Sequence, residues 1–142
     1  MSTVAEIFRA DSSSRCWRPL FSNTVPAGFP SPADDYIERS LDINEHLIQH
    51  PTATFFVRAS GDSMTGAGIH DKDLLIVDRS IDPQDGHIVI AVLDGELTVK
   101  RLRKNAGRVW LAPHNPKFAP IEISTENELT IWGVVRHVIH SV

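Results

Sequence analysis

The stretch HIVIAVLDGELTVKRL, residues 87–102, decides the fold class. Two short apolar runs, IVIAVL and ELTVKRL, lie on either side of the dipeptide Asp94-Gly95. An Asp-Gly pair between two such runs is typical of a two-residue β-hairpin. The stretch therefore predicts two antiparallel strands joined by a tight turn.

Other short apolar runs continue this pattern along the chain from about residue 53. Turn residues separate them, and almost no helical pattern lies between them. We expect a mostly β fold, in which one antiparallel domain is curled or barrel-like. The runs are TFFVRA (54–59), DLLIVD (73–78), RVWLA (108–112), IEIS (121–124) and LTIWGVVRHVI (129–139).

Residues 1–40 lack this periodicity and contain prolines at positions 26, 30 and 32. Proline fixes φ and has no N–H, so this spacing keeps a chain extended and out of helices and central strands. We expect residues 1–40 to form a flexible N-terminal arm and residues 41–142 to form a β-rich domain. Two short helical turns are predicted, over residues 33–41 and 44–49.

Composition narrows the class of protein. The 142 residues are 42% hydrophobic, which suits one compact domain with an arm. The net charge of -4 argues against a protein that mainly grips nucleic-acid phosphates, so no direct sequence-specific DNA binding is expected. We interpret the small basic cluster as a solvated strand end; it consists of Arg101, Arg103, Lys104 and Arg108.

The compartment is predicted from cysteine usage and from the apolar runs. Cys16 is the single cysteine, so no disulfide forms within the chain, which fits a reducing compartment. The first residues lack the continuous apolar segment of a secretory signal, and the longest apolar runs are too short to span a bilayer. We expect a cytoplasmic protein without membrane association.

The stretch RASGDSMT, residues 58–65, brings two serines, a glycine and an aspartate to the end of a predicted strand. Gly and Asp are ordinary turn residues, and the Ser63 hydroxyl is suited to capping the next turn. The alternative is a nucleophilic serine presented on a turn, which requires a base nearby. The local sequence leaves both interpretations open.

Histidine is the usual base for a serine nucleophile, but none of the seven histidines lies in a recognisable triad context. The G-x-S-x-G elbow is absent as well. His46 and His50, and likewise His137 and His140, have the spacing of a shared helical face, yet no Cys or acidic ligand pattern accompanies them. We interpret these histidines as surface residues and expect neither a metal nor a cofactor.

Lysine is the other candidate base. In DGELTVK, strand alternation places Thr98 and Lys100 on one face and Leu97 on the other. A lysine on the wet face of a strand is the ordinary interpretation. A lysine in an apolar setting loses its charge readily, and a Ser-Lys pair is a known nucleophile–base arrangement. Periodicity does not show whether Ser63 and Lys100 meet.

Several motifs occur in the order that a known family has them: ASGDSMTGAGIHDKDLLIVD (59–78), DGELTVKRL (94–102), LAPHNPKFAPI (111–121) and WGVV (132–135). From about Pro19 to its end, the chain resembles the UmuD-like members of the LexA/UmuD family of self-cleaving Ser-Lys peptidases. The resemblance implies the curled antiparallel β domain of that family. It also implies that Ser63 is the nucleophile and Lys100 the general base.

The family cleaves itself before a glycine in its N-terminal arm. The matching segment here is VPAGFPSPA (25–33), which places the cut between Ala27 and Gly28. Two departures from the family pattern stand out. Pro26 lacks an N–H, so an arm docked as a strand loses one hydrogen bond just before the cut. Lys72 stands where relatives usually have glycine, in a turn away from the proposed pair.

The resemblance also implies partners and a role. The 27 residues before Gly28 are too few for the three packed helices of a repressor's DNA-binding domain, which favours the UmuD branch. RecA filaments on single-stranded DNA would then stimulate removal of the arm during the SOS response to DNA damage. The trimmed homodimer would join a UmuC-like, error-prone Y-family DNA polymerase in translesion synthesis.

Two alternatives accompany this hypothesis. One is a GDSL-type esterase, because strand followed by Gly-Asp-Ser also opens that fold; the chain lacks its alternating helices and its D-x-x-H near the end, and an assay on a small ester separates the two. The other is a polymerase-binding regulatory subunit whose arm is never cut, which a cleavage experiment decides.

Overall fold

The computed structural model describes residues 3–10, 17–21, 27 and 37–142 of the chain. The chain divides into two compact units. One unit combines Met1–Ala10 with His50–Val142, and the other consists of Asp11–Gln49. Cys16, Pro26, Gly28, Pro30 and Pro32 lie outside the described residues. Among those that are described, no helix has the length and hydropathy needed to cross a membrane.

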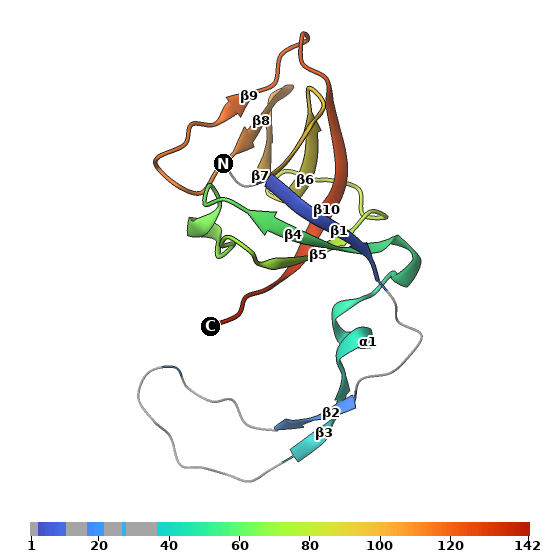
Figure 1. The fold of residues 1–142 in the computed structure, drawn as a ribbon. Helices are drawn as coiled ribbons and strands as arrows, with labels where there is room; N and C mark the ends of the chain where they lie inside the picture. The colour runs from blue at the N-terminus through green and yellow to red at the C-terminus, as the bar shows by residue number, and fades with distance from the viewer. Residues whose placement is uncertain (1–2, 11–16, 22–26, 28–36) are drawn as a thin grey trace. The chain divides into compact units, whose positions relative to one another are not determined.

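The larger unit contains an eight-stranded sheet in the order β1-β4-β5-β10-β6-β7-β8-β9, in which every neighbouring pair is antiparallel. Figure 1 shows that this sheet curls around itself. The expected mostly β, curled antiparallel fold is therefore confirmed. The strands are β1 (Thr3–Arg9), β4 (Thr54–Ser60), β5 (Leu74–Asp78), β6 (Ile88–Leu93), β7 (Glu96–Asn105), β8 (Arg108–Ala112), β9 (Ile121–Glu122) and β10 (Leu129–Ile139).

The hairpin predicted around Asp94-Gly95 is present. Leu93 pairs with Glu96, and the two residues between them have φ of 49° and 84°. Positive φ at both central positions is the requirement of the turn that best matches the twist of paired strands. The other predicted runs also form strands, β4, β5, β8, β9 and β10.

The core lies on both faces of the central strands. Ile90 of β6 belongs to one buried cluster, with Val57, Met64 and Val99, whereas its neighbour Val89 belongs to a second cluster. Because successive strand residues point to opposite faces, β6 must be covered on both sides. This explains why IVIAVL is a continuous apolar run rather than an alternating one.

The smaller unit contains a two-stranded antiparallel sheet of β2 (Trp17–Phe21) and β3 (Ile37–Asp42), followed by helix α1 (Ile43–Leu47). The Asp42 side chain accepts a hydrogen bond from the Asn44 backbone N–H and caps the helix. The helical turn predicted over 44–49 is confirmed in position. The helical turn predicted over 33–41 is wrong for residues 37–41, because these residues belong to a strand that pairs with residues 18–21, a partner that local sequence does not reveal.

Residues 3–9 belong to the larger unit. They form β1, an outer strand of the main sheet that pairs with β4 from Thr3↔Ser60 to Arg9↔Phe55. Their pattern is not periodic because most β1 side chains are exposed and only Val4 packs against the core. The strand therefore depends on its partner more than on its own sequence.

Candidate active site

Ser63 lies in the turn that follows β4. Gly61 adopts a φ of 90°, which favours glycine, and its N–H donates to Asp71 Oδ1 at 2.9 Å. The chain then reverses through Ser63 into a short 3-10 turn, Thr65–Ala67. Met64, next to Ser63, is fully buried in the core, so it anchors the turn to the core.

Lys100 lies on β7, with its side chain 1% exposed. Its Nζ is 3.3 Å from Ser63 Oγ, 2.7 Å from Thr98 Oγ1 and 3.2 Å from the Val99 carbonyl oxygen. Thr98 and Lys100 therefore lie on the same face of β7, as strand alternation predicts, but this face is buried. The interpretation of Lys100 as a lysine on a wet face is wrong for this strand.

Burial controls the charge of Lys100. Loss of hydration lowers the pKa of its ammonium from 10.5 to about 8. The hydrogen bonds described above are all to uncharged oxygen atoms, so they do little to hold the proton on the amine. A neutral amine at this position can accept a proton from the Ser63 hydroxyl, which is the first requirement of a general base.

A loop after β8 holds the serine turn from its other side. The His114 N–H donates to the Ser63 carbonyl oxygen at 2.8 Å, and the Gly66 N–H donates to the His114 carbonyl oxygen at 2.7 Å. Asn115 Nδ2 donates to the Asp62 carbonyl oxygen at 2.9 Å. Gly66 is required for this approach, because a Cβ there would lie 2.6 Å from the His114 carbonyl oxygen.

Arg101 in turn fixes the His114 ring. Its Nε donates to His114 Nε2 at 2.7 Å, which makes that ring nitrogen an acceptor. Burial, with Arg101 and Arg103 nearby, lowers the pKa of His114 and keeps the ring neutral. The sequence analysis did not single out His114, Asn115 or Gly66 for this role. The motif LAPHNPKFAPI contained two of them, but its spacing alone gives no signal that they reach Ser63.

Comparisons with known proteins identify the family of this chain. The model of the Peptidase S24-like family matches residues 19–136. The chain belongs to the Peptidase S24-like family. It is 50% identical over 129 residues to the protein ImpA of Escherichia coli, covering 87% of this chain and 83% of ImpA. It is 43% identical over 134 residues to the protein MucA of Salmonella typhimurium, covering 93% of this chain and 91% of MucA.

A repressor is also among the relatives of this S24-like chain. The LexA repressor of Ectopseudomonas mendocina is 43% identical over 116 residues, which cover 81% of this chain and 56% of the repressor. The resemblance to the LexA/UmuD family, drawn from the motifs around Ser63 and Lys100, is thereby confirmed. The antiparallel sheet also differs from the alternating helices and strands that a GDSL-type esterase requires.

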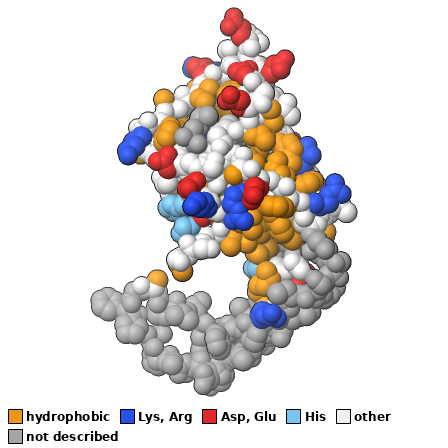
Figure 2. All heavy atoms as spheres, viewed as in Figure 1, with side chains coloured by type: hydrophobic (Ala, Val, Ile, Leu, Met, Phe, Trp, Pro, Cys, Tyr) orange, Lys and Arg blue, Asp and Glu red, His pale blue; other side chains and the backbone are white. Residues whose placement is uncertain are grey.

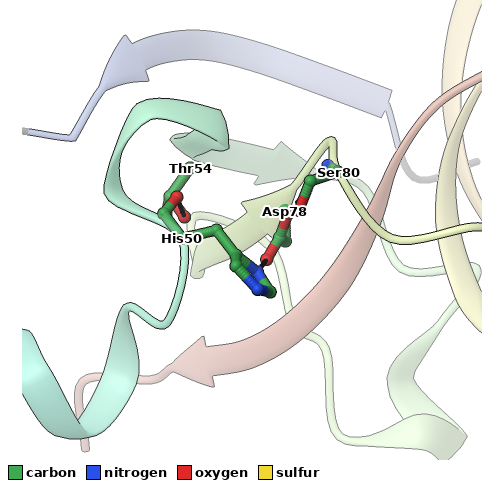
Figure 3. Close-up of polar contacts among 4 residues, drawn as sticks. All are labelled: His50, Thr54, Asp78 and Ser80. Carbon is green, nitrogen blue, oxygen red and sulfur yellow. Dashed lines mark hydrogen bonds and ion pairs between the residues drawn. The ribbon is translucent and has the colours of Figure 1, made fainter.

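A second cluster of this S24-like chain contains the residue types of a serine triad, but they are not hydrogen-bonded to one another in the order that a triad requires. Figure 3 shows Asp78 between His50 and Ser80. Asp78 Oδ2 is 2.5 Å from His50 Nδ1, and Asp78 Oδ1 accepts from Ser80 Oγ at 2.6 Å. A triad needs the imidazole between the hydroxyl and the carboxylate. This cluster therefore ties the chain before β4 to the end of β5 and offers no base to Ser80.

The other predicted site residues lie elsewhere. Ala27 is an exposed residue in a bend of the unit Asp11–Gln49, and Gly28 lies outside the described residues. Cleavage at this bond stays a prediction. His140 Nδ1 is 2.6 Å from Oδ1 of the buried Asp73, so this histidine is hydrogen-bonded within the fold. No group of three or more metal-binding side chains occurs in the part of the chain that the structure describes.

Proposed function

We propose that this chain is a self-cleaving serine peptidase that cuts its own backbone between Ala27 and Gly28. Ser63 is the nucleophile and Lys100 is the general base. The observation that carries the proposal is the buried Lys100 amine, 3.3 Å from Ser63 Oγ and with its pKa lowered to about 8. Membership of the Peptidase S24-like family supports it.

The chemistry follows from the Ser63–Lys100 arrangement. Neutral Lys100 takes the proton of the Ser63 hydroxyl as Oγ attacks the carbonyl carbon of Ala27. The C–N bond to Gly28 then breaks, and the departing Gly28 amine takes up this proton from the Lys100 ammonium. Water, deprotonated by Lys100, hydrolyses the ester between Ser63 and Ala27 and restores the hydroxyl. Small residues on both sides of the scissile bond leave its carbonyl open to attack.

We place this reaction in the SOS response to DNA damage. RecA filaments on single-stranded DNA stimulate the cut, and the trimmed protein acts as a homodimer with a UmuC-like Y-family DNA polymerase during error-prone synthesis past lesions. The support is the UmuD-like motif order and the similarity to ImpA, MucA and the LexA repressor. The protein acts in the cytoplasm in this proposal.

One experiment tests the central step. Purified full-length chain is incubated with and without RecA, ATP and single-stranded DNA, and intact masses are measured. Fragments 1–27 and 28–142 should appear, faster with the filament, whereas Ser63→Ala stays whole. A new amino terminus elsewhere would contradict the assigned bond. A wild-type chain that stays whole with the filament and at pH 10 would contradict self-cleavage and favour the regulatory-subunit alternative.

A further inference from the structure

The two strands that precede the proposed cut both pair with strands that follow it. β1 and β2 lie on the amino-terminal side of Ala27, and β3 and β4 lie on the carboxyl-terminal side. β1 pairs with β4, and β2 pairs with β3, both antiparallel. Cutting the connection between β2 and β3 therefore breaks one covalent bond and leaves both ladders in place.

Backbone contacts hold β1 along nearly the whole length of β4. The register runs from Thr3↔Ser60 to Arg9↔Phe55, with one irregularity between Val4 and Glu6. The Ala10 N–H adds a hydrogen bond to the Thr54 carbonyl oxygen at 3.1 Å. These are the contacts by which a separate extended peptide adds to the edge of a sheet.

Side chains reinforce the β1–β4 pairing. Val4 packs against the main core cluster. The hydroxyls of Thr3 and Ser60 are 2.6 Å apart, and Glu6 Oε2 lies 3.7 Å from Arg58 Nε. These contacts hold β1 in place at several positions along the strand.

The β2–β3 ladder provides a second, independent attachment. It runs from Trp17↔Asp42 to Phe21↔Ile37. Two attachments on one fragment act together, because while one remains paired, the other is held at a high effective concentration near its partner. The fragment must lose both ladders before it leaves.

We propose that cleavage between Ala27 and Gly28 leaves residues 1–27 bound to residues 28–142 through β1 and β2, so that release of the arm is a separate step. The position of the cut rests on the proposed function. The edge of β4 is thus a strand-binding site, and its occupant is the chain's own N-terminal segment. Release exposes one backbone edge of β4 (Thr54–Ser60), whereas the other edge stays paired with β5.

The test makes the cut without the chain's own chemistry. A recognition sequence for a specific protease is inserted between Ala27 and Gly28 of a full chain that carries Ser63→Ala. The protein is cut with that protease, and the products are separated by gel filtration at about 20 μM and identified by mass. Because Ser63 is absent, the result does not depend on whether the natural chain cuts itself.

Matched proline variants test whether the β1–β4 ladder holds the fragment. The hydrogen bond from Ala10 to Thr54 fixes the alternation, so the Phe8 N–H points to β4 and the Ile7 N–H points away. Phe8→Pro removes a ladder donor, whereas Ile7→Pro keeps the ladder donors. Phe8→Ala controls for loss of the exposed side chain.

We expect fragment 1–27 to co-elute with residues 28–142 in the cut parent, in Phe8→Ala and in Ile7→Pro. In the cut Phe8→Pro protein, fragment 1–27 should dissociate from residues 28–142 about tenfold more readily than in the cut parent. A fragment that elutes alone from the cut parent would overturn the proposal. Equal retention in Phe8→Pro and Ile7→Pro would overturn the role of β1.

Discussion

At the scale of single residues, the proposed self-cleavage depends on the charge of one amine. An ordinary lysine is almost wholly protonated at neutral pH and cannot accept a proton from serine. Burial of Lys100 lowers its pKa to about 8, so that about a tenth of the amine is neutral at pH 7. Slow cleavage without a filament is thus compatible with the geometry.

The pH dependence of self-cleavage follows from this pKa. In the proposed mechanism only neutral Lys100 acts as the base, so the rate without RecA should rise about tenfold per pH unit below pH 7 and level off above about pH 9. Band intensities on gels from pH 6 to 10 give the profile. A plateau already at neutrality would indicate an unperturbed histidine base instead.

Variants at the two residues complete this test. Ser63→Ala and Lys100→Ala should each abolish cleavage, and the double variant should be no worse, because the pair acts as a unit. Far-UV circular dichroism should remain unchanged. Cleavage by Lys100→Ala at pH 10 would contradict the assignment of the base.

A substitution at Gly66 tests whether the His114 loop positions Ser63. A Cβ at Gly66 would lie 2.6 Å from the His114 carbonyl oxygen, so Gly66→Ala must displace the loop, the serine turn or both. A shift of this size should slow cleavage about a hundredfold. Gly107→Ala is the control, because its φ of 78° makes alanine destabilising in a remote hairpin. If both variants lose stability but neither slows cleavage, the loop has no positioning role.

At the scale of elements, the strands with apolar runs of their own were predictable. Strands β4 to β10 contain enough hydrophobic residues to be recognised locally, and Asp94-Gly95 identified one turn. Strands β1, β2 and β3 were not predictable from local sequence, because they depend on partner strands elsewhere in the chain. Similarly, the motifs suggested Ser63 and Lys100, whereas the His114 loop became visible only through long-range packing.

The turn between β4 and β5 contains a residue under strain. Lys72 has a φ of 71°, a conformation that side chains disfavour and glycine adopts freely. Lys72→Gly should raise the free energy of unfolding by about 1 kcal/mol. Urea denaturation measures this, with Lys104→Gly in β7 as the control that should lower it. A loss of stability in Lys72→Gly would contradict the claim that the Lys72 backbone is strained.

The link between the segment before β4 and the end of β5 depends on Asp78. Burial by itself raises the pKa of this carboxyl, but hydrogen bonds from Ser80 and His50 outweigh burial and lower the pKa below its usual value. Its contribution to stability is therefore present above the unfolded pKa of about 4 and is lost as the pH falls through the lower folded pKa.

Asp78→Asn should lower the free energy of unfolding by about 2 kcal/mol at pH 7. The difference from wild type should shrink below pH 4, as the wild-type carboxyl becomes protonated. Thermal denaturation over this pH range measures it, with the exposed Asp82→Asn as the control. A difference that stays constant down to pH 2 would show that charge on Asp78 is unimportant.

At the scale of the whole molecule, β10 provides a candidate surface for the expected homodimer. The sequence suggested LTIWGVV as an interface strand. In the structure, residues 129–134 of β10 pair with β6 and residues 134–139 pair with β5, so each half of the strand is paired along one edge. Figure 2 shows a band of hydrophobic side chains over the region of β10 and β1. Exposed members of these strands include Ile7, Phe8 and Ile139.

These positions predict how cleavage affects association. Ile7 and Phe8 belong to the fragment that the proposed cut would remove, whereas Ile139 stays with the β domain. The dimer should therefore persist after the arm is removed if β10 provides its contacts. Sedimentation of the Ser63→Ala chain and of residues 28–142 at micromolar concentration should give two-chain masses for both. A monomer in both would contradict the homodimer; a dimer only with the arm present would assign the interface to the arm instead of β10.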